Sequence, residues 1–316
     1  MQVWHHTLEA APVFGPVVVT LGIFDGVHAG HRIILREAEA SATSRGLPSA
    51  VVTFDPHPSV VVAPQHKPKF LMTLAQRLAA FEMTGMDLAW VIPFSRAFSE
   101  LSPRDFLDGL HRALAPVELH VGTGFHFGHE RKGDLEVLKR WGQRVGCEIH
   151  AHALKAPDGG PLSSTRIREA LEQGVPEEVE VLLGHPYVVS GIVVEGDRRG
   201  RHLGFPTANL AWDQEQLPAN GVYVTEVHGS HVHGTRLGVT NVGEKPTFEG
   251  LKLTVETFLP EFEADLYGAH LELGFLHRLR PERRFSSIDA LRAQIAEDVI
   301  QAQAWWEDHS RKRMHG

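Results

Sequence analysis

Two patterns of apolar and polar residues divide this chain of 316 residues into two parts. In the first part, short apolar runs alternate with segments whose apolar residues recur every three or four positions. The apolar runs predict buried strands at residues 17–21, 49–54, 88–93 and 117–122. The periodic segments predict helices that begin near residue 29 or span residues 73–83, 103–114 and 134–145. Strands that alternate with helices indicate a parallel sheet whose ligands bind at the carboxyl ends of the strands.

The pattern changes at the sequence Gly184-His-Pro186. Beyond it, segments of alternating apolar and polar residues are separated by glycine-containing turns. These segments predict strands at residues 187–195, 221–227, 237–242, 253–258 and 270–275. They indicate an antiparallel barrel or sandwich, followed by a helix with a capping box at Ser286 and Asp289. We therefore expect two domains, residues 1–184 and residues 185–316.

The composition excludes several classes of protein. Hydrophobic residues make up 42% and charged residues 22% of the chain, as in soluble globular proteins. A formal net charge of −8 argues against a protein that binds nucleic acid along its phosphate backbone. No apolar stretch reaches ~18 residues and no signal-peptide pattern is present, so we expect no membrane partner. Cys147 is the one cysteine, so a disulfide framework is excluded and a cytoplasmic location is expected.

The stretch Leu21–His31 joins the first of these strands to the following helix. Backbone N–H groups and the positive end of the helix dipole face a bound anion at such a junction. His28 and His31 are three residues apart, so both side chains point the same way on the first helical turn. Two imidazoles there suit nucleotidyl transfer, in which they donate hydrogen bonds to the α-phosphate oxygens. A pair of surface histidines and a metal pair are the alternatives, although no third metal ligand is spaced nearby.

Two other segments of the first part carry candidate residues. His57 follows the second strand, at the edge of the sheet where we expect the nucleotide, and a solvated turn is its alternative. Ser163–Arg168 combines hydroxyl groups and arginines at a helix start. Such a segment suits a triphosphate tail, because hydroxyl groups donate hydrogen bonds and arginine binds phosphate in bidentate fashion. An ordinary helix cap is the alternative reading.

The second part contains a different set of candidate residues. Thr207 and Asn209 offer hard oxygen ligands that suit Mg²⁺, at the end of a segment rich in glycine and arginine. Glu256 lies within a predicted strand, where its carboxylate could accept a proton from an attacking hydroxyl group. Solvent-exposed faces of strands are the alternative for all three residues.

Several strings of residues resemble known family signatures. Gly-x-Phe-Asp-Gly-Val-His-x-Gly-His at Gly22–His31 is similar to the signature of the nucleotidylyltransferase superfamily, and Ser163–Arg168 is similar to its second signature. Over nearly its whole length the chain resembles the bacterial bifunctional riboflavin kinases/FAD synthetases. The strings that carry this resemblance are Gly22–His31, Thr53–Pro58, Phe125–Gly128, Ser163–Arg168, Gly204–Asn209, Asn241–Thr247, Glu256 and Asp265–Gly268.

The resemblance implies a fold and two reactions. Residues 1–184 would form a Rossmann-like nucleotidylyltransferase domain with a parallel sheet, the FAD synthetase (FMN adenylyltransferase). Residues 185–316 would form an antiparallel six-stranded β-barrel with a terminal helix, the riboflavin kinase. In the kinase, Glu256 would deprotonate the 5′-hydroxyl of riboflavin, which attacks the γ-phosphate of ATP to give FMN. Mg²⁺ would be held by Thr207 and, directly or through water, by Asn209.

In the adenylyltransferase, the FMN phosphate would attack the α-phosphate of a second ATP to give FAD. His28 and His31 would stabilise that transition state, and Ser164, Thr165 and Arg168 would hold the departing pyrophosphate. The resemblance extends the binding sites to Gly22, Phe24, Asp25, Gly30, His57, Phe125, Arg201 and Gly204. The partners expected are riboflavin, FMN, ATP and FAD, with ATP as co-substrate and no nucleic acid, and the oligomeric state is left open.

Two positions depart from the family pattern. Gly124 stands where the family usually has Asp or Asn, and His126 follows Phe125 where the family has a basic or polar residue. Because this loop would face the flavin, an enzyme that retains only the kinase reaction is a second hypothesis. A flavin-binding module without activity is a third, disfavoured because His28, His31 and Glu256 are all present.

Overall fold

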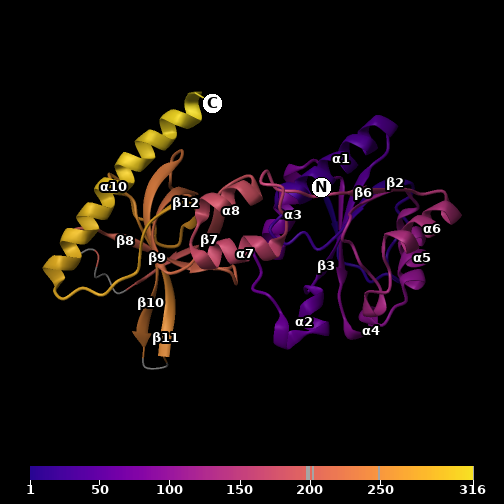
Figure 1. Ribbon diagram of the computed structural model, residues 1–316, viewed down its shortest axis with the longest axis horizontal. Helices are drawn as coiled ribbons and strands as arrows, with labels where there is room; N and C mark the ends of the chain where they lie inside the picture. Colours follow the sequence, from indigo (N-terminus) through magenta and orange to yellow (C-terminus); the bar gives the residue numbers. More distant parts are fainter. Residues whose placement is uncertain (197–199, 201–202, 248–249, 316) are drawn as a thin grey trace. The chain divides into compact units, whose positions relative to one another are not determined.

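The computed structural model describes residues 1–196, 200, 203–247 and 250–315. The chain forms two compact units, residues 1–164 and residues 165–316 (Figure 1). The division falls in the first turn of α7 (Ser164–Gln173), so α7 and α8 (Pro176–Leu183) belong to the second unit. Backbone and side-chain hydrogen bonds from Ala219 and Arg278 to α7 explain that grouping. The expected boundary after Gly184 lies two helices later, and the assignment of activities to residues 1–184 and 185–316 stays a prediction.

A parallel sheet forms the centre of the first unit. Its six strands lie in the order β1-β4-β3-β2-β5-β6, and every neighbouring pair is parallel. The strands are β1 (Gln2–Trp4), β2 (Val17–Leu21), β3 (Ser49–Asp55), β4 (Leu88–Pro93), β5 (Pro116–Gly122) and β6 (Glu148–His152). The four central strands confirm the prediction from apolar runs. The edge strands β1 and β6 were not predicted, because β6 carries polar residues at alternate positions and β1 is only 3 residues long.

Helices cover both faces of this sheet. They are α1 (Ala29–Arg45), α2 (Pro58–Val62), α3 (Leu74–Met83), α4 (Arg96–Ser99), α5 (Pro103–Leu114) and α6 (Leu135–Val145), with single turns η1 (Pro64–His66) and η2 (His129–Arg131). Neighbouring residues of β3 point to opposite sides, so Val52 joins the core that contains α5 and α6. Val51 joins a smaller core with Leu35 and Phe81. Burial on both faces explains why the central strands are continuous apolar runs.

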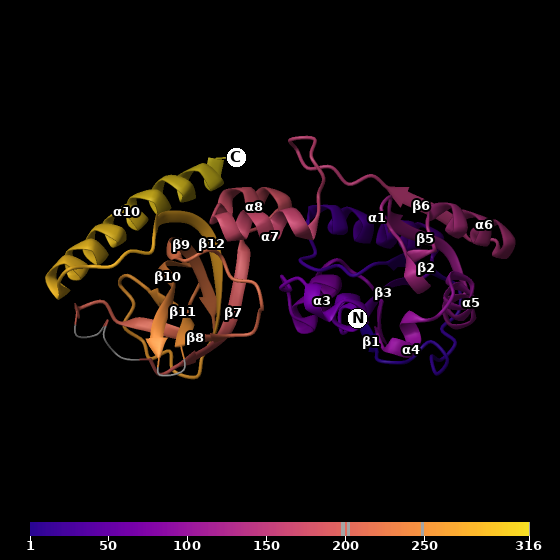
Figure 2. The same ribbon diagram turned by 60° about the horizontal axis from the view of Figure 1, so that its bottom comes forward.

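The second unit is a closed antiparallel barrel (Figure 2). Its strands follow the order β10-β11-β8-β7-β12-β9. They are β7 (Tyr187–Val194), β8 (Thr207–Trp212), β9 (Gly221–Gly229), β10 (Arg236–Thr247), β11 (Gly250–Phe258) and β12 (His270–Pro281). Of the two expected architectures, a barrel or a sandwich, the structure shows the barrel. Strand β8 is a sixth strand, in addition to the five that the alternation of apolar and polar residues predicted.

The long terminal helix α10 (Ile288–His315) packs on the outside of the barrel. Its cap is Ser287, whose Oγ accepts a hydrogen bond from the N–H of Ala290 at 3.1 Å, so the prediction of Ser286 was wrong by one residue. Ala302 and the partly buried Val299 lie against Val222 and Val224 of β9. Asp298, only 2% exposed, accepts hydrogen bonds from Arg280 of β12 at 2.9 and 2.7 Å. This bidentate ion pair ties the helix to the barrel.

We expect Asp298→Ala to lower the free energy of unfolding of the second unit by about 3 kcal/mol, because it leaves the Arg280 charge half-buried without its partner. Urea unfolding followed by circular dichroism measures the change. Asp308→Ala is the matched control, because it removes an exposed carboxylate paired with Lys312 on the same helix. Equal stability of the two variants would show that the buried pair does not tie α10 to the barrel.

Candidate active sites

The turn between β2 and α1 shapes the first candidate site. His28 is the N-cap of α1, and its Nδ1 atom accepts a hydrogen bond from the backbone N–H of His31 at 3.2 Å. The two imidazoles stack, with ring centroids 3.5 Å apart and planes 13° from parallel. The structure therefore brings together the two histidines that the sequence singled out, at the positive end of the helix dipole.

Both imidazoles are neutral in the ligand-free protein. Burial lowers the pKa of His28 to about 4, against the opposing effect of a backbone hydrogen bond. Burial, followed by the proximity of His28, holds the pKa of His31 well below its ordinary value. His31 Nδ1 is buried and has no hydrogen-bond partner in the part of the chain that the structure describes. A neutral imidazole keeps one N–H, so each ring retains a donor for a ligand oxygen.

Gly22 and Phe24 shape the turn by packing against each other and against neighbouring residues. Phe24 is buried at a φ of +56°, in the left-handed region that a bulky residue adopts only under strain. Its ring packs edge-on against His31 and Phe81. A Cβ at Gly22 would lie 3.1 Å from this ring, so glycine lets Phe24 fold back against the end of the strand. Phe24 thereby supports the His31 ring.

The structure gives Asp25 and Gly30 packing roles that the sequence reading did not foresee. The Asp25 carboxylate is 5% exposed and accepts backbone hydrogen bonds from Leu71 at 3.0 Å and Met72 at 3.2 Å. It therefore anchors the loop before α3, and its expected part in nucleotide binding stays a prediction. A Cβ at Gly30 would lie 3.0 Å from Leu154, so the missing side chain makes room for Leu154. That a ligand lies against the Gly30 backbone also stays a prediction.

Sequence reasoning missed Arg77, a buried arginine on α3. It is 5% exposed and donates hydrogen bonds to the carbonyl of Ile23 at 2.9 Å and to Thr53 Oγ1 at 3.1 Å. Its guanidinium also lies 3.5 Å from the Asp55 carboxylate. The signal was available, because Arg77 occupies an apolar position of its helix, three residues after Leu74 and four before Phe81. An arginine in such a position needs buried partners.

An aromatic cavity of about 740 Å³ opens near the end of β3. His57 and Phe125 line it, as do Ile23, Phe54, Phe94 and Phe98. His57 caps α2 through Nδ1, which lies 2.7 Å from Ser59 Oγ, and its ring stacks on Phe70. Phe125 stacks on Phe127 with centroids 5.4 Å apart. Flat apolar walls suit a planar ring system. His28 and His31 are not among the residues that line this cavity.

The residues that depart from the family pattern also lie on this cavity. A Cβ at Gly124 would meet no atom within 4 Å, so the missing side chain leaves open space. His126 Nδ1 lies 2.9 Å from the carbonyl of Gly124, whereas His129 Nδ1 lies 3.2 Å from the carbonyl of Ser99. The two histidines therefore have separate partners within the loop.

The hydroxyl-rich segment begins α7. Ser164 Oγ donates a hydrogen bond to the carbonyl of Asp25 at 2.8 Å, so Ser164 contacts the β2–α1 turn. Thr165 is exposed and Arg168 is partly buried, and both belong to the second unit. Arg166 instead pairs with Glu178 of α8 at 2.8 Å. Ser164 is thus the residue of this segment whose contact with the turn the structure describes.

The second unit brings its three candidate residues together on the outer face of the barrel. Asn209 of β8 is the register partner of Glu256 of β11. Thr207 Oγ1 donates a hydrogen bond to Glu256 Oε2 at 3.3 Å. Residues two apart on a strand share a face, so Thr207, Asn209 and Glu256 present their oxygen atoms side by side. The intervening Val255 and Thr257 are buried inside the barrel.

Lys245 of β10 completes this group and was missed from the sequence. Its Nζ atom forms an ion pair with Glu256 Oε1. Lys245 belongs to the string Asn241–Thr247 that carries the family resemblance. Only the pairing of β10 with β11, however, brings this lysine near the Glu256 carboxylate.

A cavity of about 450 Å³ lies beside Thr207. It is lined also by Pro206 and by the turn Asp265–Tyr267, where Asp265 Oδ1 accepts a hydrogen bond from the N–H of Tyr267. Gly204 precedes β8 at a φ of +88°, a conformation that favours glycine. Arg201 lies outside the described residues.

Comparisons with known proteins cover both units. A family profile described as FAD synthetase matches residues 12–166, and one described as riboflavin kinase matches residues 183–306. A protein of Escherichia coli (strain K12) named bifunctional riboflavin kinase/FMN adenylyltransferase is 37% identical over 302 residues, which cover 95% of this chain and 96% of that protein. A Listeria monocytogenes protein of the same name is 38% identical over 296 residues, with 92% of each chain covered.

One solved structure extends the likeness to the fold. The crystal structure of a macrolide-efflux protein from Streptococcus pneumoniae is 29% identical, with a TM-score of 0.87 over 96% of this chain and 100% of that one. Among the residues described here, no helix combines the length and apolarity needed to cross a bilayer.

The burial of His28 predicts a pH dependence of stability. We expect this imidazole to titrate near pH 4 in the folded protein and near its ordinary pKa of about 6.5 in the unfolded chain. The stability contributed by the neutral ring is therefore complete above pH ~6.5 and is lost as the pH falls towards 4. Two-dimensional NMR of the imidazole C–H groups measures the midpoint, with His28→Asn to assign the resonance. A midpoint near 6.5 would contradict a buried neutral ring.

Proposed function

This chain belongs to the family of bifunctional riboflavin kinases/FMN adenylyltransferases, and from that premise we propose how its residues divide the two reactions. The protein phosphorylates riboflavin with ATP to give FMN, and transfers the adenylyl group of ATP to FMN to give FAD and pyrophosphate. Its partners are therefore small molecules: riboflavin, FMN, ATP and FAD.

We assign phosphoryl transfer to the outer face of the barrel. Glu256 accepts the proton of the riboflavin 5′-hydroxyl as its oxygen attacks the γ-phosphorus, and ADP leaves. The observation that carries this assignment is the 3.3 Å contact between Thr207 Oγ1 and Glu256 Oε2, beside Asn209. The sequence separates Thr207 from Glu256 by 49 positions, and antiparallel pairing makes them neighbours.

The side-chain oxygen atoms on this outer face of the barrel suit Mg²⁺. The Thr207 hydroxyl and the Asn209 side-chain carbonyl are hard oxygen ligands of the kind that Mg²⁺ accepts while it remains partly hydrated. When bound, the ion neutralises charge on the phosphates. Lys245 holds a positive charge beside Glu256, so the carboxylate is already oriented before a substrate binds.

We assign adenylyl transfer to residues 1–184, which comprise the first unit together with α7 and α8. An oxygen of the FMN phosphate forms the new bond to the α-phosphorus, and the bond from that phosphorus to the bridging oxygen of pyrophosphate breaks. The N–H groups of the neutral His28 and His31 rings donate hydrogen bonds to the α-phosphate oxygens as their charge grows. The buried turn holds both rings in place before ATP binds.

The aromatic cavity receives the isoalloxazine ring of FMN in this proposal. His57, Phe54 and Phe125 supply flat walls, and a volume of about 740 Å³ accommodates a tricyclic ring. Ser164, Thr165 and Arg168 hold the pyrophosphate through hydroxyl and guanidinium donors. A cytoplasmic location suits the use of ATP and a single buried cysteine.

Product analysis of the purified protein tests the function as a whole. Incubation with riboflavin, ATP and Mg²⁺ is expected to give FMN and then FAD, and incubation with FMN and ATP is expected to give FAD and pyrophosphate. Chromatography separates the flavins. A folded protein that forms neither FMN nor FAD would overturn the assignment of both sites.

Replacement of the proposed base tests the kinase site. We expect Glu256→Gln to lower FMN formation from riboflavin by ~10²-fold or more, because the amide cannot accept the proton. FAD formation from supplied FMN is expected to continue at the wild-type rate. Full kinase activity in this variant would reject Glu256 as the base.

The reciprocal variant tests the adenylyltransferase site. His28→Asn keeps an acceptor at the helix N-cap, because asparagine is a good capping residue, but removes the imidazole donor. We expect FAD formation from FMN to fall ~10²- to 10³-fold, as when one transition-state donor is lost. FMN formation from riboflavin is expected to remain unchanged. An undiminished rate of FAD formation would exclude His28 from that reaction.

A further inference from the structure

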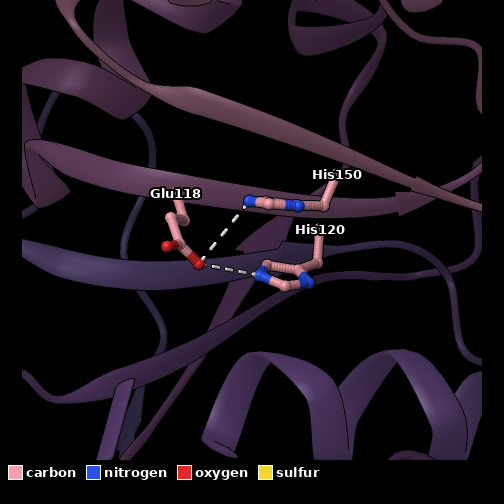
Figure 3. A group of neighbouring side chains, drawn as sticks. All are labelled: Glu118, His120 and His150. Carbon is pink, nitrogen blue, oxygen red and sulfur yellow. Dashed lines mark hydrogen bonds and ion pairs between the residues drawn. The ribbon is translucent and has the colours of Figure 1, made fainter. Parts of the chain in front are cut away.

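A cluster of histidine and glutamate side chains lies on one face of β5 and β6 and shares no residue with the sites described above (Figure 3). The two strands repeat the pattern Glu-x-His in the same register. Glu118 pairs with Glu148, and His120 pairs with His150. Register partners of parallel strands share a face, so these side chains gather on the side of the sheet where Ser41 and Arg45 of α1 lie.

Three of these residues aim ligand atoms at a common point. Glu118 Oε2 lies 3.2 Å from His120 Nε2 and 3.7 Å from His150 Nε2. One ligand atom from each residue falls within 4.8 Å of the other two. The rings of His120 and His150 stack with centroids 4.7 Å apart and planes inclined by 21°. Figure 3 shows the carboxylate and both imidazole nitrogens converging from neighbouring strands.

The burial of this cluster distinguishes it from a chance group of surface residues. The side chains of Glu118 and His120 are 3% and 5% exposed. His150 is 42% exposed as a side chain, but its Nε2 atom is buried and makes no hydrogen bond with any described residue. A buried polar nitrogen without a partner carries a free-energy cost that a ligand would remove.

We propose that Glu118, His120 and His150 bind a zinc ion, with a fourth position open to water. Two imidazoles and one carboxylate are a ligand set that suits Zn²⁺, whereas Mg²⁺ and Ca²⁺ prefer oxygen ligands. Tetrahedral zinc with bonds of about 2.1 Å keeps its ligand atoms about 3.4 Å apart. The separations of 3.2 and 3.7 Å from Glu118 Oε2 bracket that value, and the two nearly parallel imidazole rings must turn towards each other to complete the site.

Neighbouring residues support the three ligands. His120 Nδ1 lies 3.1 Å from His152 Nε2, and metal-binding histidines usually bond a second group through their other nitrogen. Arg45 pairs with Glu118 Oε1, and the Ser41 hydroxyl donates a hydrogen bond to Oε2 at 2.5 Å, so the metal would take the second lone pair of Oε2.

The proton balance of binding is simple. A zinc ion bonded to His120 Nε2 requires the proton of that ring on Nδ1, which donates it to His152 Nε2. The His152 ring then carries its own proton on Nδ1. Each neutral ring keeps one proton, so binding releases none, and the protons reach these nitrogen atoms by exchange with water.

The cluster shares no residue with the two active sites. Its helix contacts, Ser41 and Arg45, lie about 20 and 25 Å along the axis of α1 from His28, which caps the beginning of this 17-residue helix. The ion would link the edge strand β6 to β5 and thereby stabilise the end of the sheet. The inference does not depend on the reactions assigned to the active sites.

Zinc titration of the full chain tests the proposal. The protein is freed of any affinity tag, treated with EDTA and dialysed, and then titrated with ZnSO₄ by isothermal calorimetry without nucleotide or flavin. We expect one zinc per chain, a rise in melting temperature with zinc as mass action requires, and no comparable effect of MgCl₂. Substitution by Co²⁺ is expected to give the strong visible bands of a tetrahedral site.

Variants identify the ligands. His150→Gln is expected to weaken zinc binding by more than ~100-fold, and His152→Gln by ~10- to 100-fold as for a residue that orients a ligand. His150 lies at a partly exposed edge, so this variant is expected to fold, which circular dichroism verifies. The matched control is His5→Gln, which removes an exposed histidine outside the cluster and should leave binding unchanged.

Two results would overturn the proposal. One is the absence of zinc binding to the wild-type protein. The other is zinc binding with equal affinity in the wild type and in His150→Gln, because an ion held at Thr207 and Asn209 or at another histidine would survive that substitution.

Discussion

Buried side chains that bind the backbone of the β2–α1 turn are the constraint on which the first unit depends. Arg77 holds the carbonyl of Ile23, and Asp25 holds the N–H groups of the loop before α3. Phe24 fills the space beneath, in a strained backbone conformation that this packing maintains. These contacts hold the two stacked imidazoles in place. In the adenylyl transfer that we propose, preorganised donors of this kind would stabilise developing charge without reorganisation during the reaction.

In the second unit the constraint is the barrel itself, because side chains fill the interior of a small closed barrel. Thr225, Thr240 and Thr257 are fully buried and join their hydroxyl groups in a chain of hydrogen bonds of 2.7 and 2.9 Å. Side chains at the alternate positions must then point outwards. Thr207, Asn209 and Glu256 occupy such positions, so the barrel presents them on its surface. Ligand binding here depends on loops and strand ends outside the barrel rather than on a cavity within it.

Much of the fold could be predicted from local patterns. Val17–Leu21 and Leu88–Pro93 read as buried strands, because both of their faces pack against helices. Local patterns could not reveal the edge strand β6, whose polar residue His150 joins a cluster with Glu118 and His120 of β5. Nor could they show that Asp25 binds the backbone of Leu71, because that contact joins residues 46 positions apart. Lys245 was missed for the same reason, since its partner Glu256 lies on another strand. Arg77 at an apolar position of α3 was a local signal, but the pattern could not name its partners Ile23 and Thr53.

The sequence by itself determined most of the strands and helices and the change from parallel to antiparallel architecture, and it predicted the chemistry of His28, His31 and Glu256. Periodicity and residue type are local properties, and both can be read from the sequence without knowing which residues are in contact. Only the tertiary structure decided which groups meet: the stacking of the two imidazoles, the approach of Thr207 and Lys245 to Glu256, and the gathering of Glu118, His120 and His150. Strand register and burial produce these side-chain contacts, and both depend on packing between residues that are far apart in the sequence.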